Sequence, residues 1–149
     1  MNVLAPVSTI MSTELLTVNP KDSLSVAQEI FKHNKIHHLP VVRYKKLVGL
    51  ISKSDSLYFL KGYSESSYDE VINKTRLNNY TVSDIMVTGI AKLSSSDRIS
   101  VALKIFNENL FHAIPIVDEE DLVGIVTTYD VIKSLSEEPV VNTPIKAIL

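Results

Sequence analysis

Two pairs of a hydroxyl residue and an aspartate are the groups in this sequence with the clearest chemical potential. Ser52 stands three positions before Asp55, and Thr127 stands three positions before Asp130. Each pair follows a short apolar run, and a segment with helical spacing comes next. At the start of a helix, the hydroxyl and the free backbone amides can contact a phosphate. The carboxylate can accept two hydrogen bonds from a ribose diol, as acidic residues do in other nucleotide folds.

The same spacing also fits a structural role. A Ser/Thr residue followed three positions later by an acidic residue is typical of a capping box, which satisfies the first amides of a helix without any ligand. Both interpretations therefore stay open for Asp55 and Asp130.

The two pairs are copies, because the chain contains an internal repeat. Residues 7–60 align without a gap on residues 82–135. A unit of this length has a marginal core on its own, so we expect the two copies to bury their apolar faces against each other. The repeat predicts a connector at residues 61–81 and a C-terminal tail at residues 136–149 that packs on the body.

Each copy predicts the order β-α-β-β-α, which places the chain in the α/β (α+β) class. The expected strands lie at residues 15–18, 38–42 and 47–52 in the first copy and at 90–93, 113–117 and 122–127 in the second. Asp22 and Asp97 are expected to cap the first helix of each copy, and the second helices are expected to begin near Lys53 and Thr128. The second and third strands are almost wholly apolar and are expected to be covered on both faces. In the connector, residues 69–78 predict one or two helical turns.

Composition excludes several classes of function. A net charge of −2 gives no basic field for nucleic acid. The absence of cysteine excludes a thiolate site and fits a cytoplasmic location, and no apolar run approaches a membrane span. The sequence shows no nucleophile–base pair and no glycine-rich phosphate loop, so we do not expect an enzyme or a catalytic cofactor. His33, His37 and His38 lack the acidic or cysteine partners of a metal site.

The ordered motifs of both copies resemble those of the CBS domain family, and the pair resembles a tandem CBS (Bateman) module. In the first copy these motifs are residues 36–42 (IHHLPVV), residues 47–52 (LVGLIS) and Asp55. In the second copy they are residues 111–117 (FHAIPIV), residues 122–127 (LVGIVT) and Asp130. The resemblance covers most of the chain and implies a pseudo-twofold body with two clefts between the repeats.

The resemblance implies that these clefts bind AMP, ADP, ATP or S-adenosylmethionine as a regulatory ligand. The aspartate would hold the ribose, with the preceding Ser or Thr near the sugar or phosphate. The residues before the Pro-Val or Pro-Ile pair would reach phosphates, sometimes from the other repeat, and the first strand and the proline strand would hold the base. The nucleotide-binding residues that this implies are Asp130, Thr127, Asp55, Ser52, His37, His38, His112, Lys53, Leu16, Thr17, Ile90, Ala91, Pro40 and Pro115.

The two clefts are not expected to be equal. Lys92 replaces Thr17 in the second copy, and Ala113 stands where a polar residue can face the phosphate. If phosphate contacts cross between repeats, the Asp130 cleft gains two histidines from the first copy. The Asp55 cleft gains only His112, beside its own Lys53. This difference favours the Asp130 cleft.

The sequence therefore predicts a small sensor that binds an adenosyl ligand and changes its contact with a regulated protein. The resemblance also implies a homodimer formed through the second helices, which carry Leu57, Tyr58 and Phe59 in one copy and Val131 and Ile132 in the other. The alternative is a constitutive scaffold in which both aspartates act only as caps. Polynucleotide binding is a third, less favoured function, because the chain is slightly acidic.

Overall fold

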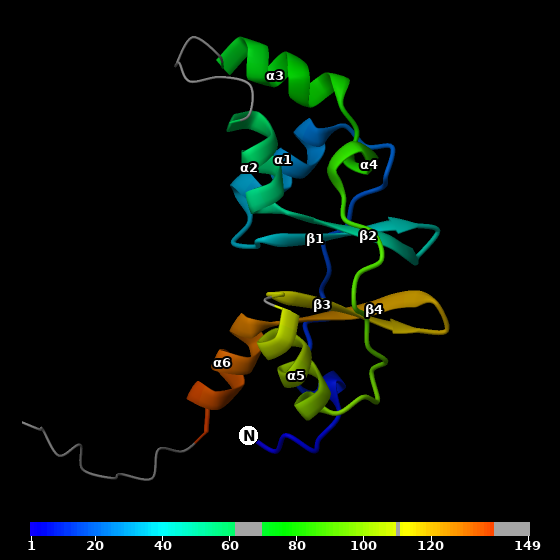
Figure 1. Cartoon of the computed structure of the whole chain (residues 1–149), viewed down its shortest axis with the longest axis vertical. Coiled ribbons are helices and arrows are strands. Elements are labelled where there is room, and N and C mark those ends of the chain that lie inside the picture. The colour runs from blue at the N-terminus through cyan, green and yellow to red at the C-terminus, as the bar shows by residue number, and fades with distance from the viewer. Residues whose placement is uncertain (62–69, 110, 139–149) are drawn as a thin grey trace, which may run out of the picture.

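The computed structural model describes residues 1–61, 70–109 and 111–138, and it shows two stacked repeats (Figure 1). The two hairpins face each other at the middle of the molecule, and the helices lie on the outer sides. The first repeat contains α1 (Leu24–His33), β1 (His38–Arg43), β2 (Lys46–Ser52) and α2 (Lys53–Lys61), and α3 (Glu70–Asn79) follows in the connector. The second repeat contains α5 (Ile99–Asn109), β3 (Ala113–Asp118), β4 (Asp121–Thr127) and α6 (Thr128–Ser136). Two short helices, η1 (Val7–Thr9) and α4 (Val82–Ile85), precede the first extended segment of the first and second copy.

The hairpin strands confirm the sequence prediction to within one residue at the turns. They form a four-stranded antiparallel sheet in the order β1-β2-β4-β3. The two hairpins meet only near their tips, where Lys46 pairs with Asp121 in the sheet register and the Leu122 amide donates to the Lys45 carbonyl at 2.9 Å. An ion pair between Lys46 and Glu120 adds to this contact.

The prediction of a first strand in each repeat is wrong. Residues 15–18 and 90–93 each contribute a single parallel bridge, Val18 to Val41 and Leu93 to Ile116. The Val18 amide donates to the Pro40 carbonyl at 3.1 Å, and the Val42 amide donates to the Val18 carbonyl at 2.9 Å. Residues 15–17 form no bridge with the sheet, and Leu15 and Leu16 line the cleft described below.

The predicted aspartate caps of the first helices are also wrong. Asp22 accepts a hydrogen bond from the Asn19 amide at 2.8 Å, and Asp97 accepts one from the Ser94 amide at 2.8 Å. Both carboxylates therefore close the turn before the helix rather than cap its first amides. By contrast, α2 and α6 begin at Lys53 and Thr128 as predicted.

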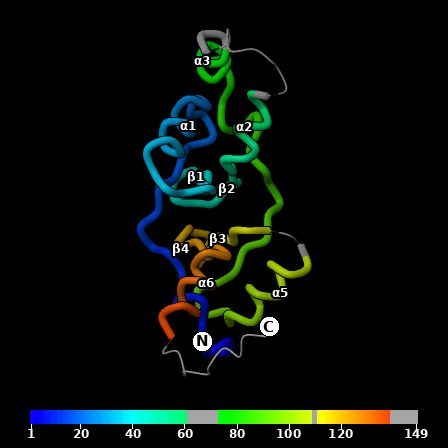
Figure 2. Tube along the Cα trace, turned by 90° about the vertical axis from the view of Figure 1, so that its left-hand side faces the viewer, coloured from blue at the N-terminus to red at the C-terminus, as the bar shows by residue number. Residues whose placement is uncertain are grey.

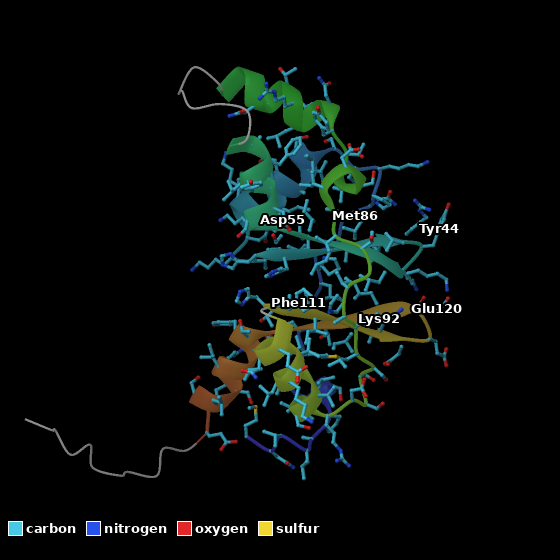
Figure 3. All side chains as sticks on the ribbon, in the orientation of Figure 1. Tyr44, Asp55, Met86, Lys92, Phe111 and Glu120 are labelled. Carbon is cyan, nitrogen blue, oxygen red and sulfur yellow. The ribbon has the colours of Figure 1, made fainter. Side chains whose placement is uncertain are left out.

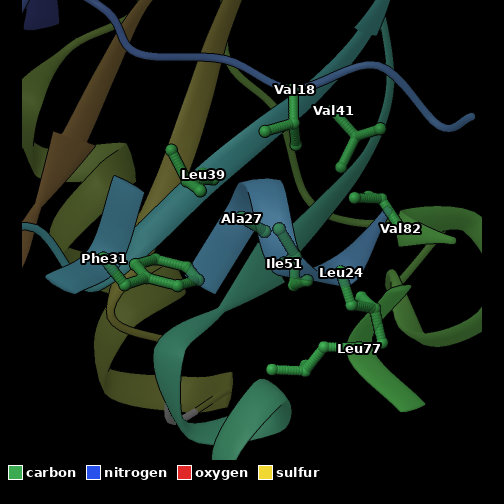
Figure 4. Packing of buried hydrophobic residues seen from close by; sticks show 9 residues of the cluster. All are labelled: Val18, Leu24, Ala27, Phe31, Leu39, Val41, Ile51, Leu77 and Val82. Atoms are coloured by element: carbon green, nitrogen blue, oxygen red, sulfur yellow. The ribbon is translucent and has the colours of Figure 1, made fainter. Parts of the chain in front are cut away.

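The first segment of each repeat packs against the core of the other repeat. The segment that opens the first copy runs along one side of the molecule, and the segment that opens the second copy runs along the other (Figure 2). The core of the first repeat includes Val82 (Figure 4). Ile85 and Met86 pack against that core, and the core of the second repeat includes Val7. Each repeat thus completes the core of the other, which confirms the expected mutual burial.

Two glycines make this exchange possible. A Cβ on Gly49 would lie 2.8 Å from the Met86 sulfur, and one on Gly124 would lie 2.6 Å from the Met11 sulfur. The Cβ atoms would also lie 3.0 Å from the Val87 carbonyl oxygen and 3.2 Å from the Ser12 carbonyl oxygen, so glycine at these strand positions gives the crossing backbone room.

The connector and tail predictions have different outcomes. Helix α3 covers most of the stretch in which one or two helical turns were expected. The tail prediction falls mainly on residues 139–149, which lie outside the described residues. Among the helices of the described residues, none has the length and apolar character needed to cross a membrane.

Candidate functional site

A cleft of about 920 Å³ lies between the repeats, at the ends of β2 and β4 where α2 and α6 begin. Its apolar wall includes Leu15, Leu16 and Ile125. The full lining comprises Ser12, Glu14, Leu15, Leu16, Lys35, Ile36, His37, His38, Ser52, Ser54, His112, Ile125, Thr127, Thr128, Tyr129, Asp130 and Lys133. The cleft therefore combines apolar surface with cationic, hydroxyl and carboxylate groups from both repeats.

Asp130 is the best-positioned carboxylate of this cleft. Its Oδ2 accepts from the Thr127 amide at 2.7 Å and from the Thr127 hydroxyl at 2.6 Å, while the Asp130 amide donates to that hydroxyl at 3.2 Å. This is a complete capping box at the start of α6. The Ser12 hydroxyl donates to Oδ1 at 3.1 Å. The side chain is half-buried, and Oδ1 keeps an acceptor position free for a ligand.

Asp55 occupies the equivalent position in the first repeat with fewer partners. Its Oδ2 accepts from the Ser52 hydroxyl at 2.6 Å and from the Ser52 amide at 3.3 Å, and its amide donates to the hydroxyl at 3.0 Å. No further side chain of the described residues donates to this carboxylate. Asp55 is exposed at the start of α2, away from the hairpin tips that carry Tyr44 and Glu120 (Figure 3).

Three histidines gather beside Ser52 and Thr127. The carbonyl of His37 accepts from the Lys53 amide at 2.8 Å, and that of His112 accepts from the Thr128 amide at 3.1 Å, so backbone contacts fix both segments to the helix starts. Burial lowers the pKa of His38, and the nearby charges of His112 and His37 lower it further, while Asp55 opposes them. These imidazoles can donate to an anion, and they share the cleft with Lys35 and Lys133.

The other predicted site residues have mixed positions. Asp130, Thr127, Ser52, Leu16 and the histidines 37, 38 and 112 line the cleft. Asp55, Lys53, Thr17, Ile90, Ala91, Pro40 and Pro115 are not among its lining residues. Pro40 and Pro115 are buried in the sheet, and their carbonyls hold the bridges of Val18 and Leu93.

Several residues that line the cleft were not predicted from the sequence. Ser12, Glu14, Lys35 and Lys133 lie outside the predicted motifs, while Tyr129 lies between Thr127 and Asp130 but was not predicted to line the site. A signal for Ser12 was present in the internal alignment, where its counterpart is the apolar Val87. Within the described residues, no group of three or more histidine, aspartate or glutamate side chains could hold a metal ion.

Two repeats with exchanged first segments and a cleft between them describe a class of fold, and comparison with known proteins identifies the family. The CBS domain family matches residues 7–60 and 82–137, and the chain belongs to this family. Inosine-5'-monophosphate dehydrogenase of Thermoplasma acidophilum is 30% identical over 83% of this chain but only 22% of its own length. The chain spans less than half of the first curated relatives that it matches.

Solved structures of CBS pairs agree with this fold. CBSX2, a CBS-pair protein of Arabidopsis thaliana whose structure was solved in complex with AMP, is 26% identical and has a TM-score of 0.73. That match covers 89% of this chain and 97% of the CBSX2 chain. The CBS domain pair of protein MJ0100, solved with 5-methylthioadenosine and S-adenosyl-L-methionine, has a TM-score of 0.69 over 87% of this chain and 98% of the other. At 24% identity, this second likeness shows the fold alone.

Proposed function

We propose that this chain is a regulatory module that binds an adenosyl ligand in the cleft around Asp130 and signals through its conformation to another protein. The observation that carries the proposal is the composition of the 920 Å³ cleft. The Asp130 carboxylate, apolar walls and cationic side chains all line this one cleft. The AMP complex of CBSX2 supports an adenine nucleotide as the ligand class.

The arrangement suggests how each part of a nucleotide would be held. Asp130 would accept hydrogen bonds from the ribose hydroxyls, with Thr127 beside it. Leu16 and Ile125 supply apolar surface for the base, and the histidines with Lys35 and Lys133 supply positive charge for phosphates. These groups bind and orient a ligand, and we propose no reaction at the site.

The outer helices support the proposed homodimer. Tyr58 on α2 is 81% exposed, and Tyr129 and Ile132 on α6 are 69% and 63% exposed. Leu57 is also exposed, whereas Phe59 packs on the core of the first repeat and Val131 is buried. Because α2 and α6 lie on the same side of the molecule (Figure 1), their exposed side chains offer one apolar face to a second copy.

Calorimetric titration of the purified chain with AMP, ADP, ATP and S-adenosylmethionine tests the ligand proposal. We expect at least one of them to bind with a micromolar dissociation constant. Adenosine and inorganic phosphate serve as partial ligands that separate the sugar-base and phosphate contributions. Absence of binding to all four would contradict the proposal.

The complete capping boxes favour a second candidate, a constitutive scaffold. Both aspartates already have structural partners within the fold. A scaffold would bind a partner protein with the same affinity in the presence and absence of adenosyl compounds, whereas a sensor would change that affinity. The regulated protein and the cytoplasmic location stay predictions.

A further inference from the structure

Ser12 gives the Asp130 carboxylate a hydrogen bond from the other repeat. The Ser12 amide donates to the Ile125 carbonyl at 2.9 Å, and the Ile125 amide donates back to Ser12 at 3.0 Å. These two bonds fix the backbone of Ser12 beside the end of β4. Its hydroxyl then donates to Oδ1 of Asp130 at 3.1 Å, across 118 positions of sequence.

The first repeat has the same backbone arrangement but a different side chain. The Val87 amide donates to the Leu50 carbonyl at 2.8 Å, and the Leu50 amide donates to Val87 at 3.0 Å. Val87 and Leu50 are the alignment counterparts of Ser12 and Ile125. Valine cannot donate a hydrogen bond, so Asp55 lacks this third donor.

We propose that Ser12 is a positioning residue that makes Asp130 the preferred ribose-binding carboxylate and that Val87 leaves Asp55 without an equivalent donor. Thr127 binds Oδ2 of Asp130, and Ser12 takes one of the two acceptor positions on Oδ1. A carboxylate held at both oxygens loses less conformational freedom when a ribose diol binds. This inference rests on the proposed function, because it names a residue that positions the carboxylate of the proposed site.

The first test compares Ser12→Val with Ser12→Thr by calorimetric titration with AMP. Valine and threonine have the same shape, so the pair differs only in the hydroxyl. We expect Ser12→Val to weaken AMP binding about tenfold, the loss of one hydrogen bond to a charged group. Ser12→Thr should restore affinity to within about twofold of the parent chain, since it keeps the donor. Equal affinities for the two variants would overturn the inference.

A second measurement compares two ligands, and a purely structural role of Ser12 would affect the affinity for both equally. Ser12 acts through the ribose contact of Asp130, so the loss in Ser12→Val should disappear for 2′,3′-dideoxy-AMP, which lacks the diol. An equal loss for AMP and the dideoxy compound would contradict a positioning role. The thermal unfolding midpoint of both variants is measured beside the titrations. A lower midpoint of Ser12→Val with unchanged AMP affinity would show that Ser12 contributes to stability alone.

The reverse substitution tests the role of Val87 beside Asp55. Val87→Thr places a hydroxyl at the backbone position equivalent to Ser12, and we expect it to strengthen AMP binding at Asp55. The result would appear as a second binding event or as an increase in its affinity, and Asp55→Asn in the same background should remove it. Unchanged binding in Val87→Thr would overturn the role assigned to Val87. Failure of the parent chain to bind any adenosyl ligand would instead contradict the proposed function.

Discussion

Asp130 and Asp55 show how one residue type with one local motif can have different surroundings. Both form a capping box with the hydroxyl residue three positions earlier. The structural interpretation of the motif is therefore correct for both, yet it uses only Oδ2 of each carboxylate. The two carboxylates differ in burial and in the contacts of Oδ1. Asp130 is half-buried and its Oδ1 accepts from Ser12, while Asp55 is exposed.

The histidines of the cleft predict a pH-dependent affinity for phosphate ligands. Burial and neighbouring imidazoles lower the pKa of His38 below its ordinary value, so His38 is mainly neutral near pH 7. A bound phosphate favours the imidazolium, so binding takes up protons and the affinity for AMP rises as the pH falls from about 8 to about 6. Titrations with AMP across this range measure the effect, with adenosine as the control that should stay flat. A flat AMP affinity would contradict the prediction.

The same pKa shift has a consequence for folding. The pKa of His38 lies lower in the folded than in the unfolded chain, so the unfolded chain takes up the proton first as the pH falls. The contribution of His38 to the free energy of unfolding should therefore decrease below about pH 6.5. His38→Gln should reduce the slope of stability against pH in urea denaturation, and an unchanged slope would argue against the shift.

Sequence reasoning found the local part of the site and missed the distant part. The spacing of Thr127 and Asp130 lies within one helical turn, so it was visible directly. The contact of Ser12 with Asp130 depends on the exchange of first segments, which no local pattern encodes. The histidines were found through the family resemblance, and their joint position required the fold.

At the scale of elements, the hairpin turns carry local strain. Tyr44 and Lys45 have φ values of 50° and 68°, and Glu119 and Glu120 have 49° and 72°. Two consecutive residues with positive φ form the turn that matches the strand twist, but this conformation favours Asn-Gly. The predicted strand bounds leave residues 43–46 and 118–121 as the connections, but the residue types there gave no sign of the turn type.

Replacing Tyr44-Lys45 with Asn-Gly should stabilise the protein. Relief of the left-handed conformation at two ordinary residues is worth about 1–2 kcal/mol in the free energy of unfolding. The backbone carbonyl of residue 45 still accepts from Leu122, so the contact between hairpins is kept. Urea denaturation measures the change, and Tyr44→Ala, which keeps the strain, is the control. A midpoint equal to that of the parent chain would contradict the explanation.

The elements that failed to match prediction share a physical cause. Residues 15–18 have a strand-like composition, but the exchanged segment crosses from one repeat to the other and pairs at Val18 alone. Asp22 has the residue type of a helix cap, but it binds the preceding Asn19 amide because that turn must position the crossing segment. In both cases tertiary connection overrides a local preference.

At the scale of the whole molecule, the exchange of first segments joins the two repeats into one body. Each core requires residues from the other copy, and the cleft takes its walls from both. A ligand that contacts both repeats can therefore change their relative position, which is the conformational change that a sensor needs. The apolar face on α2 and α6 lies on this same body, where such a change can affect the contact with a second copy.

The homodimer prediction is tested by a charge placed on that face. Ile132→Asp puts a carboxylate on an exposed apolar position and should convert the dimer to a monomer, because burial of an unpaired charge opposes association. Light scattering after gel filtration measures the mass. Lys104→Asp, an exposed position on α5, is the control that should stay dimeric. A monomeric parent chain would contradict the prediction.

The most direct test of the central claim is a calorimetric comparison of Asp130→Asn and Asp55→Asn with AMP as ligand. Asparagine keeps a side-chain acceptor for each capping box but removes the charge that favours the ribose hydroxyls. We expect Asp130→Asn to weaken AMP binding about tenfold or more and Asp55→Asn to leave the principal binding event unchanged. Undiminished AMP binding in Asp130→Asn would show that the cleft around Asp130 is not the principal binding site.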